Sequence, residues 1–384
     1  MLSRIAENLY WIGRYVERAE NTARLLDVNY HAVIEAPSQT GQRKPGQGQT
    51  SQGQTSQGQV QSQTGQSQGQ TDQGQTSQGQ TDQSQAGQAD EQDVIEQIIA
   101  EQWAPLLTII DDDDGTFRQH FDHKDRNTVS EWLAFHHDNP SSITSSLTFA
   151  RENARTLRDR ISSEMWQAMN RTYLDYCVDS SDVLEREDLH DYCAGVRDAS
   201  HLFFGIADAT MPRDLGWLFM KVGQYLERAD NVLRVLTLRY RQQQKNHLIA
   251  QELHVHRSMA LLRSISAYEA FRKQHHSAIS ADDVAQFLLL NADFPRSVRF
   301  SLNVVHDILR DIQIRNDAAI AQRPVRQAGW LAARLEYLHN AKQVLVEEQP
   351  SAEDLLESIA DLSNSISQAY FVFNTDAAQQ NQRA

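Results

Sequence analysis

Residues 13–24 read GRYVERAENTAR, and residues 223–234 read GQYLERADNVLR. At this constant offset of 210 positions the two stretches share Gly, Tyr, Glu, Arg, Ala, Asn and Arg, and two further positions differ conservatively. Agreement of this length within one chain is typical of a duplicated structural unit. The pair predicts two equivalent elements in the fold, and we expect any functional site of the protein to belong to them.

Both stretches have the apolar spacing of an α-helix. Apolar residues recur at alternating steps of three and four over residues 9–26 and again over residues 222–236. At 100° per residue, Glu17, Asn21 and Arg24 fall on nearly the opposite face of the first helix. The second copy repeats this arrangement, so each helix is expected to have one apolar stripe and one polar face.

Each helix also contains a glycine at the same position of the motif. Gly13 and Gly223 cost about 1 kcal/mol of helix propensity each. A glycine that is kept in both copies predicts close approach of another backbone or of a ligand, with simple drift as the alternative.

One acid–base pair in each copy can form within its own helix. Glu20 precedes Arg24 by four positions, and Asp230 precedes Arg234 by four, which is the favourable order for a pair on a helix surface. These four side chains therefore need no outside partner.

The Glu-Arg dipeptide of each copy lacks such partners. Arg18 and Arg228 have no acid three or four positions away, Glu227 has no base there, and Glu17 has only Arg14. We expect reciprocal pairing across a pseudo-two-fold axis, Glu17 with Arg228 and Glu227 with Arg18, or both pairs around a ligand. A solvated polar face and a buried, purely structural network remain open as alternatives.

The rest of the chain predicts an all-α fold, a bundle of roughly eight to ten helices. Convincing period-two strands are absent from the sequence. A helical pattern that restarts at Val94 is expected to break at Pro105 and the acidic run after it. A long helix is expected from Ser141 through Ile161. Further helical windows are expected at about 185–206, 214–244, 251–273, 281–290, 295–314, 325–346 and 352–372.

A Gln/Gly/Ser-rich tract follows the first helix. Its only aliphatic side chains are those of Val60, Ala86 and Ala89, too few to offset the chain entropy of folding, so we expect disorder. The tract reads as an insertion in a surface loop and not as a linker between domains. The expected organisation is a first motif helix at 1–36, a disordered insertion at 37–92, the remainder of one domain at 93–374, and a disordered tail at 375–384.

Composition narrows the class of protein. The formal net charge of −15 argues against nucleic acid or an anionic membrane as partner. No apolar run approaches the roughly 20 residues of a membrane span, and the N-terminus lacks the apolar centre of a signal peptide. Cys177 and Cys193 match no zinc or redox spacing and predict reduced thiols. We expect a cytoplasmic protein without a membrane partner.

Other chemistry finds little support in the sequence. Arg296 and Arg299 follow a proline at a predicted helix N-terminus, where they would suit a phosphate or carboxylate, with surface arginines as the alternative. Histidines occur as adjacent pairs or as His-x-His, and no Glu-x-x-His or His-Glu-x-x-His motif is present, so no metal is expected. Without a phosphate loop or dinucleotide turn, no cofactor is expected either.

Four segments resemble the Alpha-E family, a bacterial all-helical domain with a Glu-Arg motif. They are LSRIAENLYWIGRYVERAENTARLL (2–26), FARENARTLRDRISSEMW (149–166), MPRDLGWLFMKVGQYLERAD (211–230) and FLLLNADFPRSVRFSL (287–302). The resemblance spans the chain except the Gln-rich tract. It implies association with an ATP-grasp-type ligase and a transglutaminase-like protein, as part of a system that makes or modifies amide bonds in peptides.

These observations predict a helical accessory subunit of such a system, whose activity as an enzyme stays open. The alternatives are a non-catalytic scaffold with a structural Glu-Arg network, and an independent amidohydrolase or cyclase acting on the ligase product. In the predicted site Glu17 and Glu227 would bind an amine or act as general acid and base. The predicted substrate-binding residues are Arg18, Asn21, Arg24, Arg228, Asn231, Arg234, Arg296 and Arg299, with the guanidiniums holding a carboxylate or phosphate.

Overall fold

A computed structural model describes residues 3–35, 103–109, 115–178, 189–245, 251–316, 322–346 and 351–372. Within these ranges every regular element is a helix and there is no strand, which confirms the predicted all-α class. The expected insertion at 37–92 and the expected tail at 375–384 lie outside the described residues.

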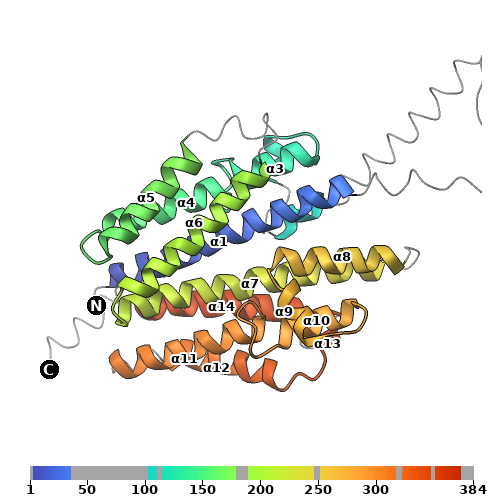
Figure 1. Cartoon of the computed structure of the whole chain (residues 1–384). Helices are drawn as coiled ribbons and strands as arrows, with labels where there is room; N and C mark the ends of the chain where they lie inside the picture. The colour runs from blue at the N-terminus through green and yellow to red at the C-terminus, as the bar shows by residue number, and fades with distance from the viewer. Residues whose placement is uncertain are drawn as a thin grey trace, which may run out of the picture.

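Two long helices form the centre of the molecule. Helix α1 (Ser3–Glu35) and helix α7 (Leu215–Lys245) lie side by side and run in the same direction (Figure 1). The apolar stripe predicted for α1 is buried, and so is most of its polar face, because other helices cover α1 on its remaining sides. The burial of polar groups on both central helices requires that these groups pair with each other.

The two glycines of the repeated motif lie where α1 and α7 touch. A Cβ atom at Gly13 would collide with the carbonyl oxygen of Met220 and lie 2.9 Å from the amide nitrogen of Gln224. A Cβ atom at Gly223 would likewise collide with the carbonyl oxygen of Tyr10. The contacts are thus reciprocal at the offset seen in the sequence. Glycine is required at both positions because the neighbour is backbone, which cannot move aside.

One group of helices packs on the α1 side of this pair (Figure 1). Ser142 and Ser162 begin two of these helices, since each side-chain oxygen accepts a hydrogen bond from a backbone amide of the first turn. The group comprises the 3-10 helix η1 (Phe117–Gln119), α3 (Arg126–Ala134), α4 (Ile143–Thr156), α5 (Ser163–Cys177) and α6 (Leu189–Thr210).

The remaining helices follow α7 in the chain and gather mainly around it (Figure 1). Helix α11 makes the most extensive of these contacts with α7, and α14 and α10 also reach it. The set comprises α8 (Gln251–Ser264), α9 (Tyr268–Gln274), α10 (Ala281–Leu290), α11 (Val298–Asn316), α12 (Gln322–Glu336), α13 (Ala341–Leu345) and α14 (Ala352–Tyr370).

Several predicted helices have wrong boundaries. The helix expected to reach Ile161 ends at Thr156, and the window at 251–273 is divided at Ser266, whose φ of 54° is left-handed. The window at 325–346 is divided where Asn340 caps a new short helix. Residues 103–109 are helical and include Pro105, while the preceding part of the predicted helix, from Val94, lies outside the described residues. Local propensity gave way to tertiary contacts at each of these points.

None of the helices in the described ranges is both long enough and apolar enough to cross a membrane.

Candidate functional site

The central site is a pair of reciprocal ion pairs between α1 and α7. Arg228 donates to Glu17 through Nε (2.6 Å) and Nη2 (2.7 Å), and Arg18 donates to Glu227 through Nε (2.6 Å) and Nη2 (3.1 Å). Both are bidentate contacts, in which Nε donates to Oε1 and Nη2 donates to Oε2. The predicted cross-pairing is therefore confirmed, as the unpaired charges of each isolated helix required.

The same charged groups are withdrawn from water. The side chain of Glu17 is 1% exposed, and that of Arg228 is 9% exposed, so a solvated polar face is the wrong description of these helices. Burial by itself would raise the pKa of Glu227, but Arg18 and Arg14 more than offset this effect and lower that pKa to about 2. Glu227 consequently stays ionised at neutral pH.

A cavity of about 290 Å³ opens beside Glu227, and we call it the Arg14 cavity. Arg14 contacts Glu227 through Nε and donates from Nη1 to the hydroxyls of Tyr10 (2.9 Å) and Ser363 (3.1 Å), the latter from α14. Two guanidiniums thus share one carboxylate here, and Arg18 remains 22% exposed. The charged and amide side chains that line this cavity are Arg14, Arg18, Glu227, Asp230, Asn231, Arg234 and Asn364.

A second cavity of about 280 Å³ opens beside Glu17, and we call it the Arg296 cavity. Arg296 donates to both oxygens of Glu20 (2.8 and 2.7 Å) and reaches Glu17 at 3.4 Å. The Lys221 ammonium donates to Asp208 at 3.1 Å. The charged side chains lining this cavity are Glu17, Glu20, Asp208, Lys221, Arg228 and Arg296, with His201 beside them, and Arg24 reaches Glu20 from within the protein.

The second acid of each motif copy is in a different electrostatic environment. Burial would raise the pKa of Glu20, but Arg296, His201 and Arg24 outweigh burial and hold it well below its usual range. Burial raises the pKa of Asp230, and Arg234 offsets this only in part. Asp230 therefore takes up a proton more readily than an ordinary aspartate.

The other predicted substrate-binding residues of the motif lie partly in the protein interior and partly at the wall of a cavity. Arg24 pairs with Glu20 and with the Ser266 hydroxyl and is buried, so it supports the site from within the protein. Asn21 accepts a hydrogen bond from Arg296 at 3.3 Å. Asn231 and Arg234 line the Arg14 cavity, and Arg234 pairs with Asp230 at 2.9 Å as the spacing predicted.

The predicted anion site formed by Arg296 and Arg299 is not brought together. Arg296 precedes α11 and turns into the Glu-Arg network, whereas Arg299 lies in the first turn of that helix. The Arg299 guanidinium donates to the Leu290 carbonyl at 3.5 Å and lies 3.9 Å from Glu336. The two guanidiniums have separate partners, so their joint binding of one anion is corrected to a role for Arg296 alone.

Several residues of the site were missed in the sequence. Arg14 carried a partial signal, since it lies within reach of Glu17 along the helix, but its partner is Glu227. Ser363, Asp208 and His201 come from other helices and carry no local pattern. Burial lowers the pKa of Lys221 although Asp208 opposes this, a property that only the folded chain defines.

The fold and site define an all-helical domain in which two motif helices exchange buried Glu-Arg pairs. The chain belongs to the Alpha-E family, described as a predicted alpha-helical domain with a conserved ER motif, which matches residues 1–371. The two repeated stretches of this chain each hold one Glu-Arg dipeptide, Glu17-Arg18 and Glu227-Arg228.

Curated relatives of the chain are longer proteins. Uncharacterized proteins of Mycobacterium bovis and of two Mycobacterium tuberculosis strains are each 23% identical to it over 233 residues. The match covers 59% of this chain and 24% of each relative. No solved structure is a significant match.

Proposed function

We propose that this chain is a cytoplasmic, helical accessory subunit of an ATP-grasp/transglutaminase-type system that modifies peptides at amide bonds, and that its Arg14 cavity binds a carboxylate of the peptide. The partner assignment follows from the family resemblance. The assignment of the cavity follows from its charges and from its access to solvent.

The single observation that carries the proposal is that two guanidiniums share one carboxylate while one of them, Arg18, is 22% exposed. Arg14 and Arg18 both contact Glu227, whose one negative charge compensates only one of them. A second carboxylate, supplied by a ligand, would complete the pairing at the partly exposed Arg18. A planar guanidinium suits this ligand because it can hold two oxygens at once.

The acidic residues of the cavity have different roles in this proposal. Glu227 has a pKa of about 2, so it holds Arg14 and Arg18 in place better than it exchanges protons. Asp230, whose pKa is raised by burial, is the better candidate to bind the amine of a substrate or to transfer a proton. Asn231 offers an amide at the same wall for orientation.

A structural scaffold is the second candidate function, and the Arg296 cavity favours it. Glu17 is 1% exposed and contacts Arg228 and Arg296, so that side of the network is complete without a ligand. A protein in which both sides served only to fix helix register would bind no carboxylate at Arg18.

Binding of a defined probe distinguishes these candidates. We would titrate the full chain with a tripeptide that has a free C-terminal carboxylate, and with its C-terminal amide, by calorimetry. The carboxylate is expected to bind, and Arg18→Gln is expected to weaken it at least about tenfold, the loss of roughly 1.4 kcal/mol. Arg155→Gln is the matched control, since Arg155 is 59% exposed and pairs only with Glu152. Equal affinity for both peptides, or an equal loss in the control, would contradict the proposed site.

The partner assignment needs its own experiment. The chain would be co-purified with an ATP-grasp-type ligase and a transglutaminase-like protein of the same organism, and small peptides would be searched for a new amide by mass spectrometry. Arg18→Gln is expected to retain the complex and lose the amide product. A purified chain that binds neither protein would overturn the accessory role while leaving carboxylate binding intact.

A further inference from the structure

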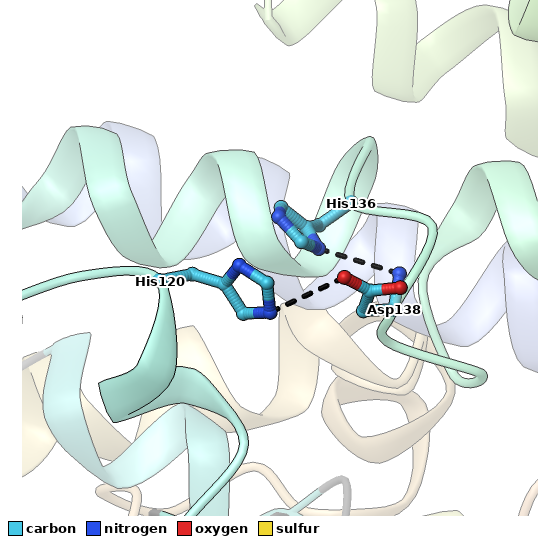
Figure 2. Close-up of side chains that lie close together, drawn as sticks. All are labelled: His120, His136 and Asp138. Atoms are coloured by element: carbon cyan, nitrogen blue, oxygen red, sulfur yellow. Dashed lines mark hydrogen bonds and ion pairs between the residues drawn. The ribbon is translucent and has the colours of Figure 1, made fainter.

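Two histidines and an aspartate come together away from the Glu-Arg network. His120 follows η1, whereas His136 and Asp138 lie in the connection between α3 and α4 (Figure 2). One ligand atom from each of the three side chains lies within 4.8 Å of the other two, and this is the one such grouping in the described residues. The sequence patterns predicted no metal site, because the three residues share no local motif.

The geometry of the cluster approaches that of a metal site. His120 Nε2 lies 3.2 Å from a carboxylate oxygen of Asp138. Two ligands of one tetrahedral zinc ion, each about 2.0–2.1 Å from the metal, lie roughly 3.3 Å apart. His120 and Asp138 are therefore already at ligand spacing, and a ring nitrogen of His136 lies within 4.8 Å of both ligand atoms.

The two imidazoles are held against an aromatic wall. The ring of His136 lies 4.7 Å from that of Trp132 and 4.3 Å from that of His120, measured between centroids. Trp132 is 1% exposed, so this wall belongs to the rigid core. The opposite side is open to solvent, since the Asp138 side chain is 65% exposed. Imidazole rings that pack on the core and have one side open to solvent suit a metal ion that enters from solution.

We propose that His120, His136 and Asp138 form a binding site for a divalent transition-metal ion such as Zn²⁺. Two imidazole nitrogens and one carboxylate oxygen are the donor set that zinc accepts, and hard cations such as Mg²⁺ prefer oxygen alone. Three protein ligands leave a tetrahedral position for water or another ligand. The metal would tie the segment around η1 to the α3–α4 connection, which also carries Ser141 of the Arg14 cavity.

The test uses Zn²⁺ itself as the probe. Tag-free full-length chain would be titrated with Zn²⁺ by calorimetry, together with His120→Ala, His136→Ala and the matched control His137→Ala. His137 is the adjacent exposed histidine and is not part of the cluster. The wild type and the control are expected to bind one ion per chain with the same affinity, and each ligand variant to bind at least about tenfold more weakly.

A second measurement, the shift of the thermal midpoint by Zn²⁺, distinguishes loss of metal binding from impaired folding. Zn²⁺ is expected to raise the thermal midpoint of the wild type and of His137→Ala, because an ion that binds only the folded state stabilises it. His120→Ala should lose this shift. The proposal is overturned if the wild type shows neither binding nor a shift, if His120→Ala retains both, or if His137→Ala loses as much affinity as the ligand variants.

Discussion

The Arg14 cavity and the Arg296 cavity lie beside equivalent pairs of the same two helices, yet their charges are completed differently. In the Arg296 cavity, an arginine from the start of α11 bridges Glu17 and Glu20. In the Arg14 cavity the second arginine on Glu227 is Arg14 of α1 itself, Arg18 stays 22% exposed, and Asp230 has a raised pKa. The charges of one motif copy can therefore be paired within the protein, while those of the other copy stay available to a ligand.

The largest expected difference between the cavities concerns their buried acids. Glu17→Gln leaves the buried Arg228 without its carboxylate partner, while Arg296 keeps Glu20, and is expected to cost about 3–5 kcal/mol of unfolding free energy. Glu227→Gln is expected to cost less than this, since Arg18 can turn toward water and Arg14 keeps its hydrogen bonds to the Tyr10 and Ser363 hydroxyls. Urea unfolding followed by circular dichroism measures both. Equal losses would show that the cavities do not differ in completeness.

Acid should weaken the protein through Glu227. The pKa of this carboxylate is about 2 in the folded state, against 4.5 for the group without perturbation. The resulting stabilisation, on the order of 3 kcal/mol, is present above pH 4.5 and is lost as the pH falls from 4.5 toward 2. Unfolding free energies measured across this range should fall more steeply for the wild type than for Glu227→Gln. Parallel curves would contradict the assignment.

The close backbone contact between α1 and α7 can be tested by substitution of Gly13. Gly13→Ala places a methyl group against the Met220 carbonyl, and we expect a loss of about 2–3 kcal/mol despite the better helix propensity of alanine. Gly205→Ala, in the middle of α6, is the matched control because nothing lies within 4 Å of its Cβ position. The control should gain about 0.5–1 kcal/mol. A stabilised Gly13→Ala protein would rule out close backbone approach.

The smallest effect is expected at Asp230. Burial raises the pKa of Asp230, so folding already disfavours its charge, and Asp230→Asn should change stability by less than about 1 kcal/mol. Its counterpart Glu20 has a strongly lowered pKa, and Glu20→Gln should behave like Glu17→Gln. Thermal midpoints of the two variants, compared at pH 7, measure this contrast. A large loss in Asp230→Asn would place Asp230 among the structural acids.

Much of the central site was predictable from residues 13–24 and 223–234. Counting partners at three and four positions left Glu17, Arg18, Glu227 and Arg228 unsatisfied, and burial then required them to meet. The identity of further partners was not predictable in this way. Ser363 comes from a helix more than three hundred positions away, and no periodicity links it to Arg14.

Helix boundaries and surface clusters show the same limit. The windows divided at Ser266 and Asn340 have continuous apolar patterns, and only packing decides that the chain turns there. His120 directly follows a 3-10 helix, whereas His136 and Asp138 lie in a loop, so their proximity depends on how Trp132 and its neighbours fill the core.

The sequence by itself determined that the chain is helical, that two of its helices are equivalent in motif, and that their Glu-Arg dipeptides need each other, because these properties follow from local spacing and from charge. The tertiary structure alone decided which cavity Arg296 closes, that Arg14 contacts Glu227, and where Arg299 is directed. Those outcomes depend on long-range packing of side chains, and the free energy of that packing has no signature within a single helix.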